Sequence, residues 1–410
     1  METTPQTVRE TLVKLRELPP IPVERRVAAL AKLWQQVCLA PPEPTPAPFV
    51  PHFADPPLVQ GRVDTSGASS RVGSGGFPWA QVRRGIKALA RSAPHCSESG
   101  DFEKPGVLAL ILAGNTPLLA WPVLHYAVLL GIPVFIKQSR DETVWTRHFV
   151  ETLAEIDPEV AALLHLDSFP GDDLRTKTLV QNADAVIAYG GDESIAALHE
   201  ATPEATPFQG FGHAISIGLI GGHWDAHRFA RDVLMYDQAG CLSLQTLLVA
   251  YAYGSKVGHA LALALERQRE RLGVKARTDA AECRIVREAR DLALMEGREV
   301  LGNSDLCWSV VIHQEPCPLP APTGFCVVHV IPYDDQKPFQ WFLGEYVGKI
   351  SCVGECVPGR SDWWNQALKA EGVSRICQAG TMQMPPLDWR NGNVDLRVWL
   401  LEALGDVRSA

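Results

Sequence analysis

The longest uncharged stretch of the chain covers residues 106–136, which contain no Asp, Glu, Lys or Arg. A membrane-spanning helix needs only about 20 apolar residues, so length alone permits one. An N-T-P tripeptide at 115–117 and a G-I-P tripeptide at 131–133 break the stretch, however, into short segments. These segments fit a strand over 107–113, a helix over 117–130 and a strand over 133–136. Because strands buried on both faces of a parallel sheet are continuously apolar, the pattern predicts a βαβ unit.

The same alternation of short apolar runs and amphipathic segments continues toward residue 201. It predicts the following elements: helix 142–155, strand 163–167, helix 172–181, strand 184–189 and helix 192–201. Strands that alternate with helices in this way favour a doubly wound parallel sheet.

A second set of elements follows residue 214. We expect strands at 214–220, 245–251, 308–313, 325–331, 349–353 and 374–377, and helices at 224–235, 255–272, 279–296 and 361–371. This set predicts another α/β layer. Two α/β lobes with a cleft between them is therefore the expected architecture.

The first hundred residues have a different pattern. Two amphipathic helices are predicted at about 5–17 and 23–38, and a third at 77–92. Between them, residues 41–57 hold eight prolines, which excludes a helix or an inner strand. The expected division is N-terminal helices with a proline-rich segment, a nucleotide-binding domain, a catalytic domain and a C-terminal tail: 1–100, 101–213, 214–385 and 386–410.

Composition limits the classes of partner. The chain of 410 residues is 46% hydrophobic and 21% charged, as in ordinary globular proteins. Its formal net charge of -9 argues against non-specific nucleic-acid binding and against attraction to an anionic membrane. Residues 1–20 have no apolar core of a secretory signal, and the ten cysteines lack pairing-like spacing. We expect a cytoplasmic protein with reduced thiols and no integral membrane segment.

The common cofactor and metal motifs are missing from the sequence. It has no G-x-G-x-x-G after a strand, no G-x-x-x-x-G-K-[ST], no H-E-x-x-H and no paired C-x-x-C. Cys352 and Cys356, with Cys326 and His329 upstream, have loose spacing among apolar strands. No metal site is predicted there.

Five short motifs do stand in order along the chain: GNTP (114–117), FIKQSR (135–140), AYGGDESI (188–195), QGFGHA (209–214) and QAGC (238–241). In this order they resemble the motif series of the aldehyde dehydrogenase superfamily. Within it the chain is most similar to the LuxC-like long-chain fatty acyl-CoA and acyl-protein reductases, a likeness that includes the LDWRNGNVDLRVWL tail (387–400). The resemblance covers about residues 100–400. It implies an aldehyde dehydrogenase-like fold of two doubly wound α/β domains with the active-site cleft between them.

The resemblance makes Cys241 the catalytic nucleophile and Asn115 a donor of the oxyanion hole, together with the Cys241 backbone amide. The chemistry agrees, because a thiolate attacks a carbonyl at neutral pH and the resulting oxyanion needs preorganised donors. Two alternatives stay open from the residues alone. Cys241 could be a buried packing cysteine, and Asn115 a plain helix N-cap.

For the cofactor, the resemblance points to Lys137, Ser139, Arg140, Gly190 and Gly191. The family places a glutamate three residues after the lysine, where it meets the adenosine ribose, and here that position is Arg140. An arginine there removes the repulsion of a 2′-phosphate and offers it a matching donor fork, so NADPH is expected over NADH.

Ordinary structural roles remain as alternatives for these residues. Lys137 could be a solvated lysine at a strand end, Gly190 and Gly191 turn glycines, and Arg140 could pair with a neighbouring carboxylate.

At the position of the family's catalytic glutamate the chain has Gln209, which cannot activate water, and His213 takes the place of a lysine. The acyl group should therefore leave to a thiol or to hydride. The predicted activity is reduction of a long-chain fatty acyl-CoA or acyl-carrier thioester to the aldehyde. The alternatives are a hydrolytic aldehyde dehydrogenase and a catalytically silent acyl-binding scaffold. Oligomers are usual in the superfamily, so the tail 385–410 is a candidate for an intersubunit strand.

Overall fold

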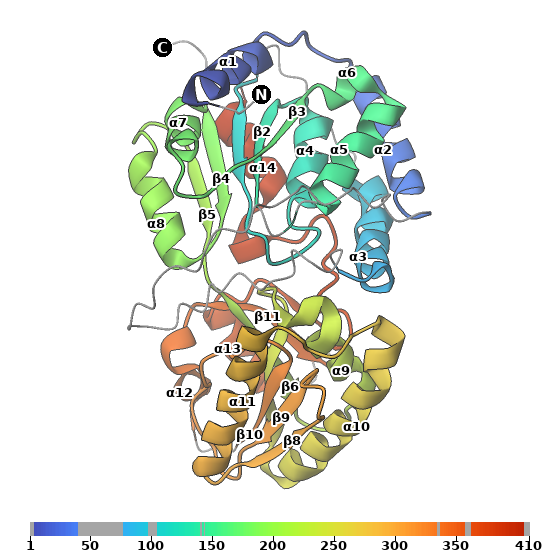
Figure 1. The fold of residues 1–410 in the computed structure, drawn as a ribbon, viewed down its shortest axis with the longest axis vertical. Coiled ribbons are helices and arrows are strands. Elements are labelled where there is room, and N and C mark those ends of the chain that lie inside the picture. The colour runs from blue at the N-terminus through green and yellow to red at the C-terminus, as the bar shows by residue number, and fades with distance from the viewer. Residues whose placement is uncertain are drawn as a thin grey trace.

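A computed structural model describes residues 4–39, 77–96, 105–139, 142, 144–333, 337–356 and 362–405. Two β-sheets form the centres of two lobes, one above the other in Figure 1. Residues 212–214 join the last strand of the first sheet to the first strand of the second. The predicted two-lobed α/β architecture is confirmed.

The first sheet has five parallel strands in the order β3-β2-β1-β4-β5. Their bounds are β1 (Leu108–Ile111), β2 (Val134–Gln138), β3 (Leu164–Ser168), β4 (Ala185–Tyr189) and β5 (Phe208–Phe211). The chain builds β2 and β3 on one side of β1 and then returns to build β4 on the other. The order reverses between β1 and β4, and open α/β sheets bind ligands at the carboxyl ends of strands at such a point.

Helices cover both faces of this sheet. One face packs against α1 (Pro5–Arg16), α7 (Leu174–Asn182) and α8 (Asp192–Ala201). The other packs against α2 (Val23–Gln36), α4 (Trp121–Leu130), α5 (Trp145–Ile156) and α14 (Leu396–Leu404). The short helix α6 (Pro158–Ala161) precedes β3. Burial on both faces explains why the strands are continuously apolar.

The uncharged stretch forms β1, α4 and β2, and β1 pairs with β2 in parallel. The predicted βαβ unit is confirmed, although α4 begins at Trp121 and not at residue 117. Residues 117–120 form a turn, and Pro122 occupies the first turn of the helix, where its missing N–H is not needed. No helix within the described ranges is long and apolar enough to cross a membrane.

The second sheet has seven strands in the order β12-β11-β6-β7-β10-β9-β8. Their bounds are β6 (Ile215–Ile220), β7 (Leu244–Ala250), β8 (Glu299–Gly302), β9 (Ser309–Ile312), β10 (Val327–Tyr333), β11 (Ile350–Glu355) and β12 (Ile376–Gln378). All pairs are parallel except β8 with β9. The helices of this lobe are α9 (Ala226–Leu234), α10 (Gly254–Leu272), α11 (Ala280–Met295), α12 (Phe339–Leu343) and α13 (Asp362–Ala370). Short 3₁₀ turns are η2 (Ala93–Cys96), η3 (Met235–Gln238), η4 (Tyr251–Tyr253), η5 (Gly344–Tyr346) and η6 (Asn391–Asn393).

The three predicted N-terminal helices exist as α1, α2 and α3 (Trp79–Ser92). Arg16 at the end of α1 pairs with Asp184 at 3.0 Å, and the fully buried Arg26 of α2 donates to the Leu129 carbonyl at 2.7 Å. The first helices are therefore integrated into the first lobe. The proline-rich segment 41–57 lies outside the described residues.

Several elements differ from the prediction. Strands β5 and β8 and helix α12 were not expected. The tail was a candidate for an intersubunit strand, but its residues 396–404 form α14, which buries Leu396, Leu400 and Leu404 against the first lobe. These leucines recur every four residues behind an Asp395 N-cap, which is the spacing of a helix face.

Candidate active site around Cys241

Cys241 follows an unusual turn, η3, which precedes β7. Tyr236, Asp237 and Gln238 all have positive φ angles, of 54°, 53° and 60°. Residues other than glycine rarely adopt this conformation, because the side chain crowds the backbone. Three in succession persist only where surrounding contacts hold them.

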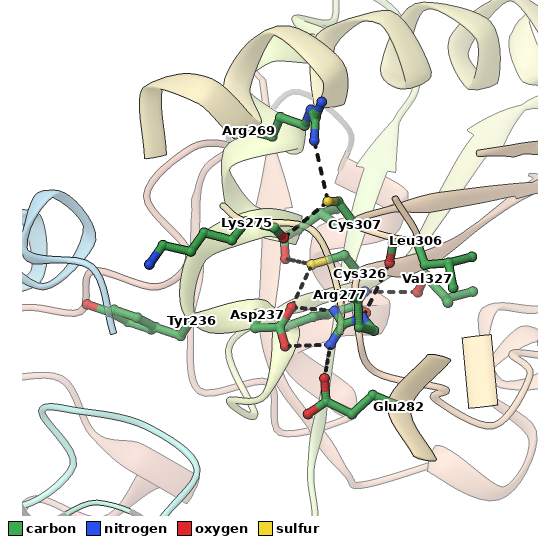
Figure 2. Close-up of polar contacts among 12 residues, drawn as sticks. Tyr236, Asp237, Arg269, Lys275, Arg277, Glu282, Leu306, Cys307, Cys326 and Val327 are labelled. Atoms are coloured by element: carbon green, nitrogen blue, oxygen red, sulfur yellow. Dashed lines mark hydrogen bonds and ion pairs between the residues drawn. The ribbon is translucent and has the colours of Figure 1, made fainter. Parts of the chain in front are cut away.

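An ion pair holds the first part of this turn. The Asp237 carboxylate accepts two hydrogen bonds from the Arg277 guanidinium, at 2.7 and 3.2 Å, and Figure 2 shows the two groups facing each other. Glu282 reaches the same guanidinium at 2.5 Å. Burial lowers the pKa of Arg277, but the carboxylates of Asp237 and Glu282 raise it by a larger amount. The net shift is upward, so this buried guanidinium keeps its charge.

Arg277 also contacts two other left-handed segments. Its Nε donates to the Leu306 carbonyl at 3.3 Å, and its guanidinium lies 4.8 Å from the centre of the Phe325 ring. Leu306, Phe325 and the next residue, Cys326, all have positive φ angles. The Cys326 thiol donates to Asp237 at 3.5 Å (Figure 2). Arg277 thus joins the turn before Cys241 to two other segments with positive φ angles.

Two glutamines fix the rest of the turn. The Gln238 amide donates to the carbonyls of Leu244 and Val327, at 2.7 and 3.0 Å, which closes the chain around Cys241. Gln81 of α3 accepts from the Tyr236 backbone at 2.8 Å. The N-terminal helices therefore support the second lobe as well as the first.

Asn115 lies on the turn after β1, facing the Cys241 turn. Its amide donates to the Ala239 carbonyl at 2.9 Å. Gly240 fits closely against the same turn, because an added Cβ would lie 2.7 Å from the Thr116 methyl group. The N-cap alternative for Asn115 is wrong, since Ala120 occupies the N-cap of α4. The structure brings Asn115 and the Cys241 turn together, and the amide keeps a second N–H.

The Cys241 residue is half-buried. The Ser216 hydroxyl donates to the Cys241 carbonyl at 2.6 Å. Burial raises the pKa of the Cys241 thiol, and the Ser351 hydroxyl and the backbone amides of Cys241 and Leu242 lower it by less, so the net direction is upward.

An aromatic pair lies at the carboxyl edge of the first sheet. Tyr189 and Phe211 end β4 and β5, and their rings stack at 4.7 Å between centres with an interplanar angle of 15°. Burial raises the pKa of the Tyr189 phenol, and the negative charge of Cys241 raises it further. Gln209 stands two residues before Phe211 and so lies on the same face of the sheet. Its amide donates to the Gly210 carbonyl at 3.1 Å.

The residues predicted to bind the cofactor lie at the carboxyl ends of β2 and β4, the two strands on either side of β1. Lys137 is buried at the end of β2, in register with Ile111 of β1 and Asp167 of β3. Gly190 and Gly191 follow β4, and the backbone at Gly191 is open, with no atom within 4 Å of where a Cβ would be. Both groups flank the point where the strand order reverses. The open backbone at Gly191 leaves room for a ligand at this position, which is where open α/β sheets bind ligands.

Ser139 and Arg140 are the two other residues predicted to bind the cofactor. Ser139 is half-buried directly after β2, while Arg140 lies outside the described residues. Glu142, one of the carboxylates that could have paired with Arg140, accepts hydrogen bonds from the backbone of Val144 and Trp145 and from Thr146. It therefore caps the start of α5.

Asp192, the first residue of α8, connects the two lobes. Its carboxylate accepts from the His213 backbone at 2.6 Å and pairs with Lys349 of the second lobe at 3.5 Å. The His213 hydrogen bond lowers the pKa of Asp192. The His213 side chain is exposed.

Nothing in the described ranges groups three or more potential ligands for a metal ion. The cysteines and histidine weighed as ligands have other neighbours. Cys352 lies 3.6 Å from Cys377, Cys356 accepts from the Asp225 backbone, and His329 is hydrogen-bonded to His313.

The sequence did not single out Ser216, Tyr189 or Arg277. Each reaches the site from a distant part of the chain, and serine or arginine within an apolar strand or a loop carries no motif. The signal that the sequence did contain was the position of Tyr189, which directly precedes the Gly190-Gly191 pair.

Comparisons with known proteins agree with this geometry. Residues 88–390 match the family model described as acyl-CoA reductase (LuxC). A long-chain acyl-protein thioester reductase of Aliivibrio fischeri is 29% identical over 148 residues, which are 34% of this chain and 31% of that protein. The match therefore spans about a third of the length of this curated relative.

Solved structures show the same fold. Aldehyde dehydrogenase 21 of Physcomitrella patens has a TM-score of 0.68 at 11% identity, covering 98% of this chain and 89% of that one. The NAD-dependent aldehyde dehydrogenase of Sinorhizobium meliloti has a TM-score of 0.65 at 16% identity, covering 92% and 80%. At these identities the likeness concerns the fold alone. Together with the family match over three quarters of its length, it shows that the chain belongs to the LuxC acyl-CoA reductase family, with an aldehyde dehydrogenase-like fold.

Proposed function

We propose that the protein reduces a long-chain fatty acyl thioester, carried by CoA or by an acyl carrier, to the fatty aldehyde with NADPH, through a thioester on Cys241. The observation that carries the proposal is the position of Cys241. Ala239, two residues before it, accepts a hydrogen bond at 2.9 Å from Asn115, which follows β1 at the carboxyl end of the first sheet. The family supplies the reaction class, and the named relatives supply the long-chain thioester.

The covalent steps follow from the groups at the site. The Cys241 sulfur attacks the acyl carbon, a C–S bond forms, and the second N–H of Asn115 and the Cys241 amide bind the oxyanion. The bond to the carrier thiol then breaks, and that thiol leaves with the proton that Cys241 lost. Hydride adds to the acyl carbon, the bond to Cys241 breaks, and the aldehyde leaves as the Cys241 thiolate forms again.

The cofactor, when bound, supplies this hydride. Lys137, Ser139, Arg140, Gly190 and Gly191 are the residues proposed to hold it. Lys137 and Arg140 would meet the 2′-phosphate of NADPH, and the open backbone at Gly191 leaves room for the pyrophosphate at the start of α8.

Gln209 is the reason for proposing a reductase over a hydrolytic dehydrogenase. Its neutral amide cannot remove a proton from water, and it lies on the face of β5 that carries Phe211. An acyl-enzyme without such a base is protected from hydrolysis. It then persists until a thiol or hydride removes the acyl group.

The experiment is to mix the protein with a long-chain fatty acyl-CoA and NADPH and to measure NADPH oxidation, free CoA and aldehyde together. The proposal predicts that all three change in equal amounts. Free fatty acid released without NADPH oxidation would indicate a hydrolase, and no reaction with either CoA or carrier thioesters would refute catalysis.

A further inference from the structure

Two hydrogen bonds between Gly240 and Ser243 enclose Cys241. The Ser243 amide donates to the Gly240 carbonyl at 2.9 Å, and the Gly240 amide donates to the Ser243 hydroxyl at 3.2 Å. The first of these bonds closes a β-turn in which Cys241 and Leu242 are the two central residues. Ser243 is fully buried, so both bonds are shielded from water. Cys241 therefore occupies a closed turn whose two ends are tied to each other.

This closed turn determines where the Cys241 N–H points. A peptide unit is planar and trans, so its C=O and its N–H point in opposite directions. The C=O of Gly240 is directed to the Ser243 amide, and the N–H of Cys241 belongs to the same peptide unit. The Cys241 N–H therefore points away from Ser243. It is one of the two donors proposed to bind the oxyanion.

The preceding peptide unit is held at both ends. Its C=O, from Ala239, accepts the Asn115 amide at 2.9 Å, and its N–H, from Gly240, donates to the Ser243 hydroxyl. The two proposed oxyanion donors, the Asn115 amide and the Cys241 N–H, are thus linked through this one peptide unit. Whatever holds the Ser243 hydroxyl in place also holds this link.

Gln383 reaches the Ser243 hydroxyl from the loop after β12. It is 5% exposed, and its amide donates to the Ser243 hydroxyl and, at 3.3 Å, to the Met235 carbonyl. Its side-chain oxygen lies close to Gly240, since a Cβ added there would be 3.3 Å from it. The Ser243 oxygen therefore accepts two hydrogen bonds, one from Gln383 and one from Gly240, and these fix its orientation.

The backbone on both sides of Gln383 is held by charged side chains. The Asp232 carboxylate of α9, fully buried, accepts from the Met382 amide at 3.1 Å. The Arg375 guanidinium donates to the carbonyls of Met382 and Met384, the latter at 3.3 Å. The loop that carries Gln383 is therefore anchored to the second lobe independently of the turn that it contacts.

We propose that Gln383 is a positioning residue, which acts through Ser243 to fix the peptide unit that presents the Cys241 N–H to the acyl oxyanion. Preorganised donors stabilise an oxyanion because they need no reorientation when the charge develops. Without the Gln383 amide, the Ser243 hydroxyl can rotate away from the Gly240 N–H, and the donor loses its fixed direction. For its effect on turnover this inference rests on the proposed function, because both use the oxyanion formed at Cys241.

The test compares two reactions of Cys241 that differ in whether an oxyanion forms. A long-chain alkyl trifluoromethyl ketone adds reversibly to the thiolate: a C–S bond forms, and the π electrons of the carbonyl move to its oxygen. Iodoacetamide instead loses iodide as the C–S bond forms, and no oxyanion appears. The alkylation rate is measured by peptide mass spectrometry, and the ketone affinity is measured as the protection of Cys241 against alkylation.

Gln383→Met removes the amide but keeps the length of the side chain. We expect the ketone to bind about tenfold or more weakly, part of the cost of losing an oxyanion donor, while the alkylation rate stays within about twofold. Gln340→Met is the matched control, because Gln340 of α12 donates a comparable bond to Glu371 at 2.9 Å on the surface. It should leave both measurements unchanged. Unchanged ketone affinity in Gln383→Met, or an equal fall in ketone affinity and alkylation rate, would overturn the proposal.

Ser243→Ala keeps the test decisive if Gln383→Met does not fold. It leaves Gln383 in place and removes the hydroxyl through which Gln383 acts, so the same loss of ketone affinity is expected, and unchanged affinity would overturn the proposal. Where both variants fold, the double variant should bind the ketone no more weakly than Ser243→Ala alone, because the two residues act as a unit. Losses that add in full would show that Gln383 acts by another route.

The ketone measurement needs neither turnover nor cofactor, so it separates this inference from the proposed function. If ketone affinity falls as expected while acyl-CoA fails to acylate Cys241, the proposed function fails and the positioning role of Gln383 stands. If acyl-CoA acylates Cys241 and ketone affinity is the same in parent and variants, the reverse holds. A ketone that gives no protection in the parent protein would overturn the positioning role, whatever acyl-CoA does.

Discussion

Asp237, four residues before Cys241, forms an ion pair with Arg277 through two hydrogen bonds of 2.7 and 3.2 Å. The arginine side chain is 6% exposed and the aspartate side chain 26%. Asp237 itself has a positive φ angle, as do its neighbours on both sides. The pair therefore positions the turn that presents the sulfur.

Removing this guanidinium should release the turn. Arg277→Met leaves two carboxylates without their cation, which for a buried pair costs about 3 kcal/mol of stability. In the fraction that stays folded, we expect slower Cys241 alkylation as well, because the strained turn relaxes. Urea unfolding and alkylation of the same samples measure both effects.

Arg284 on the exposed side of α11 is the matched control. It pairs with Glu288 at 3.7 Å, with both side chains more than half exposed. Arg284→Met should change stability by less than about 1 kcal/mol and leave alkylation unchanged. Equal effects of the two substitutions would contradict a positioning role for Arg277.

Asn115→Ala tests the oxyanion hole. Loss of one such donor lowers turnover by about a hundredfold or more. Stability should change little, because Asn115 is exposed and does not cap α4. Asn182→Ala, which removes a comparable amide bond to the Thr178 carbonyl far from Cys241, is the control. Unchanged turnover in folded Asn115→Ala would show that the amide only ties two turns together.

Gln209 should decide between thiol and water as the acceptor of the acyl group. With fatty aldehyde, oxidised cofactor and free CoA, the parent is expected to form acyl-CoA and little free acid. Gln209→Glu introduces a base and should raise the acid fraction, whereas Gln209→Ala should not. An unchanged product ratio in Gln209→Glu would mean that water does not reach the acyl-enzyme.

Cofactor preference depends on Arg140, which lies outside the described residues, and on Lys137. We expect a higher kcat/KM with NADPH than with NADH, and a reversed ratio in Arg140→Glu, because a carboxylate repels the 2′-phosphate. Arg147→Glu on α5 is the charge-matched control. Equal use of NADH by the parent would refute the preference.

The pH dependence of acylation has a defined sign. The pKa of the Cys241 thiol lies above its ordinary value, since burial outweighs the donors. Below that pKa the thiolate fraction grows tenfold with each pH unit, so the rate of acyl-enzyme formation should still rise above neutral pH. A rate that is flat between neutral and mildly alkaline pH would contradict this.

The βαβ unit and the positions of Cys241 and Asn115 could be predicted because each depends on local sequence. Apolar runs marked the strands, and N-T-P and A-G-C marked turns next to them. Strand β5 was missed because Phe-Gln-Gly-Phe lacks a strand-like pattern and is stabilised by pairing with β4. Helix α14 was missed although its leucine spacing was visible.

The surroundings of the sulfur could not be predicted in the same way. Ser216 reaches the Cys241 carbonyl from β6, and Arg277 reaches Asp237 across forty residues of chain. Such contacts arise only when the strands are placed side by side. The three positive φ angles before Cys241 likewise reflect the contacts that enforce them and not residue preference.

The most direct test of the central claim is to incubate the protein with a long-chain fatty acyl-CoA without cofactor and to map the acyl group by peptide mass spectrometry. The acyl group is expected on Cys241, with one CoA released per chain, and later addition of NADPH should convert it to aldehyde. Cys241→Ser should form no adduct, because an unactivated serine is a poor nucleophile, yet it should still fold. An acyl group on another cysteine, or full turnover by Cys241→Ser, would contradict the assignment of Cys241 as the nucleophile.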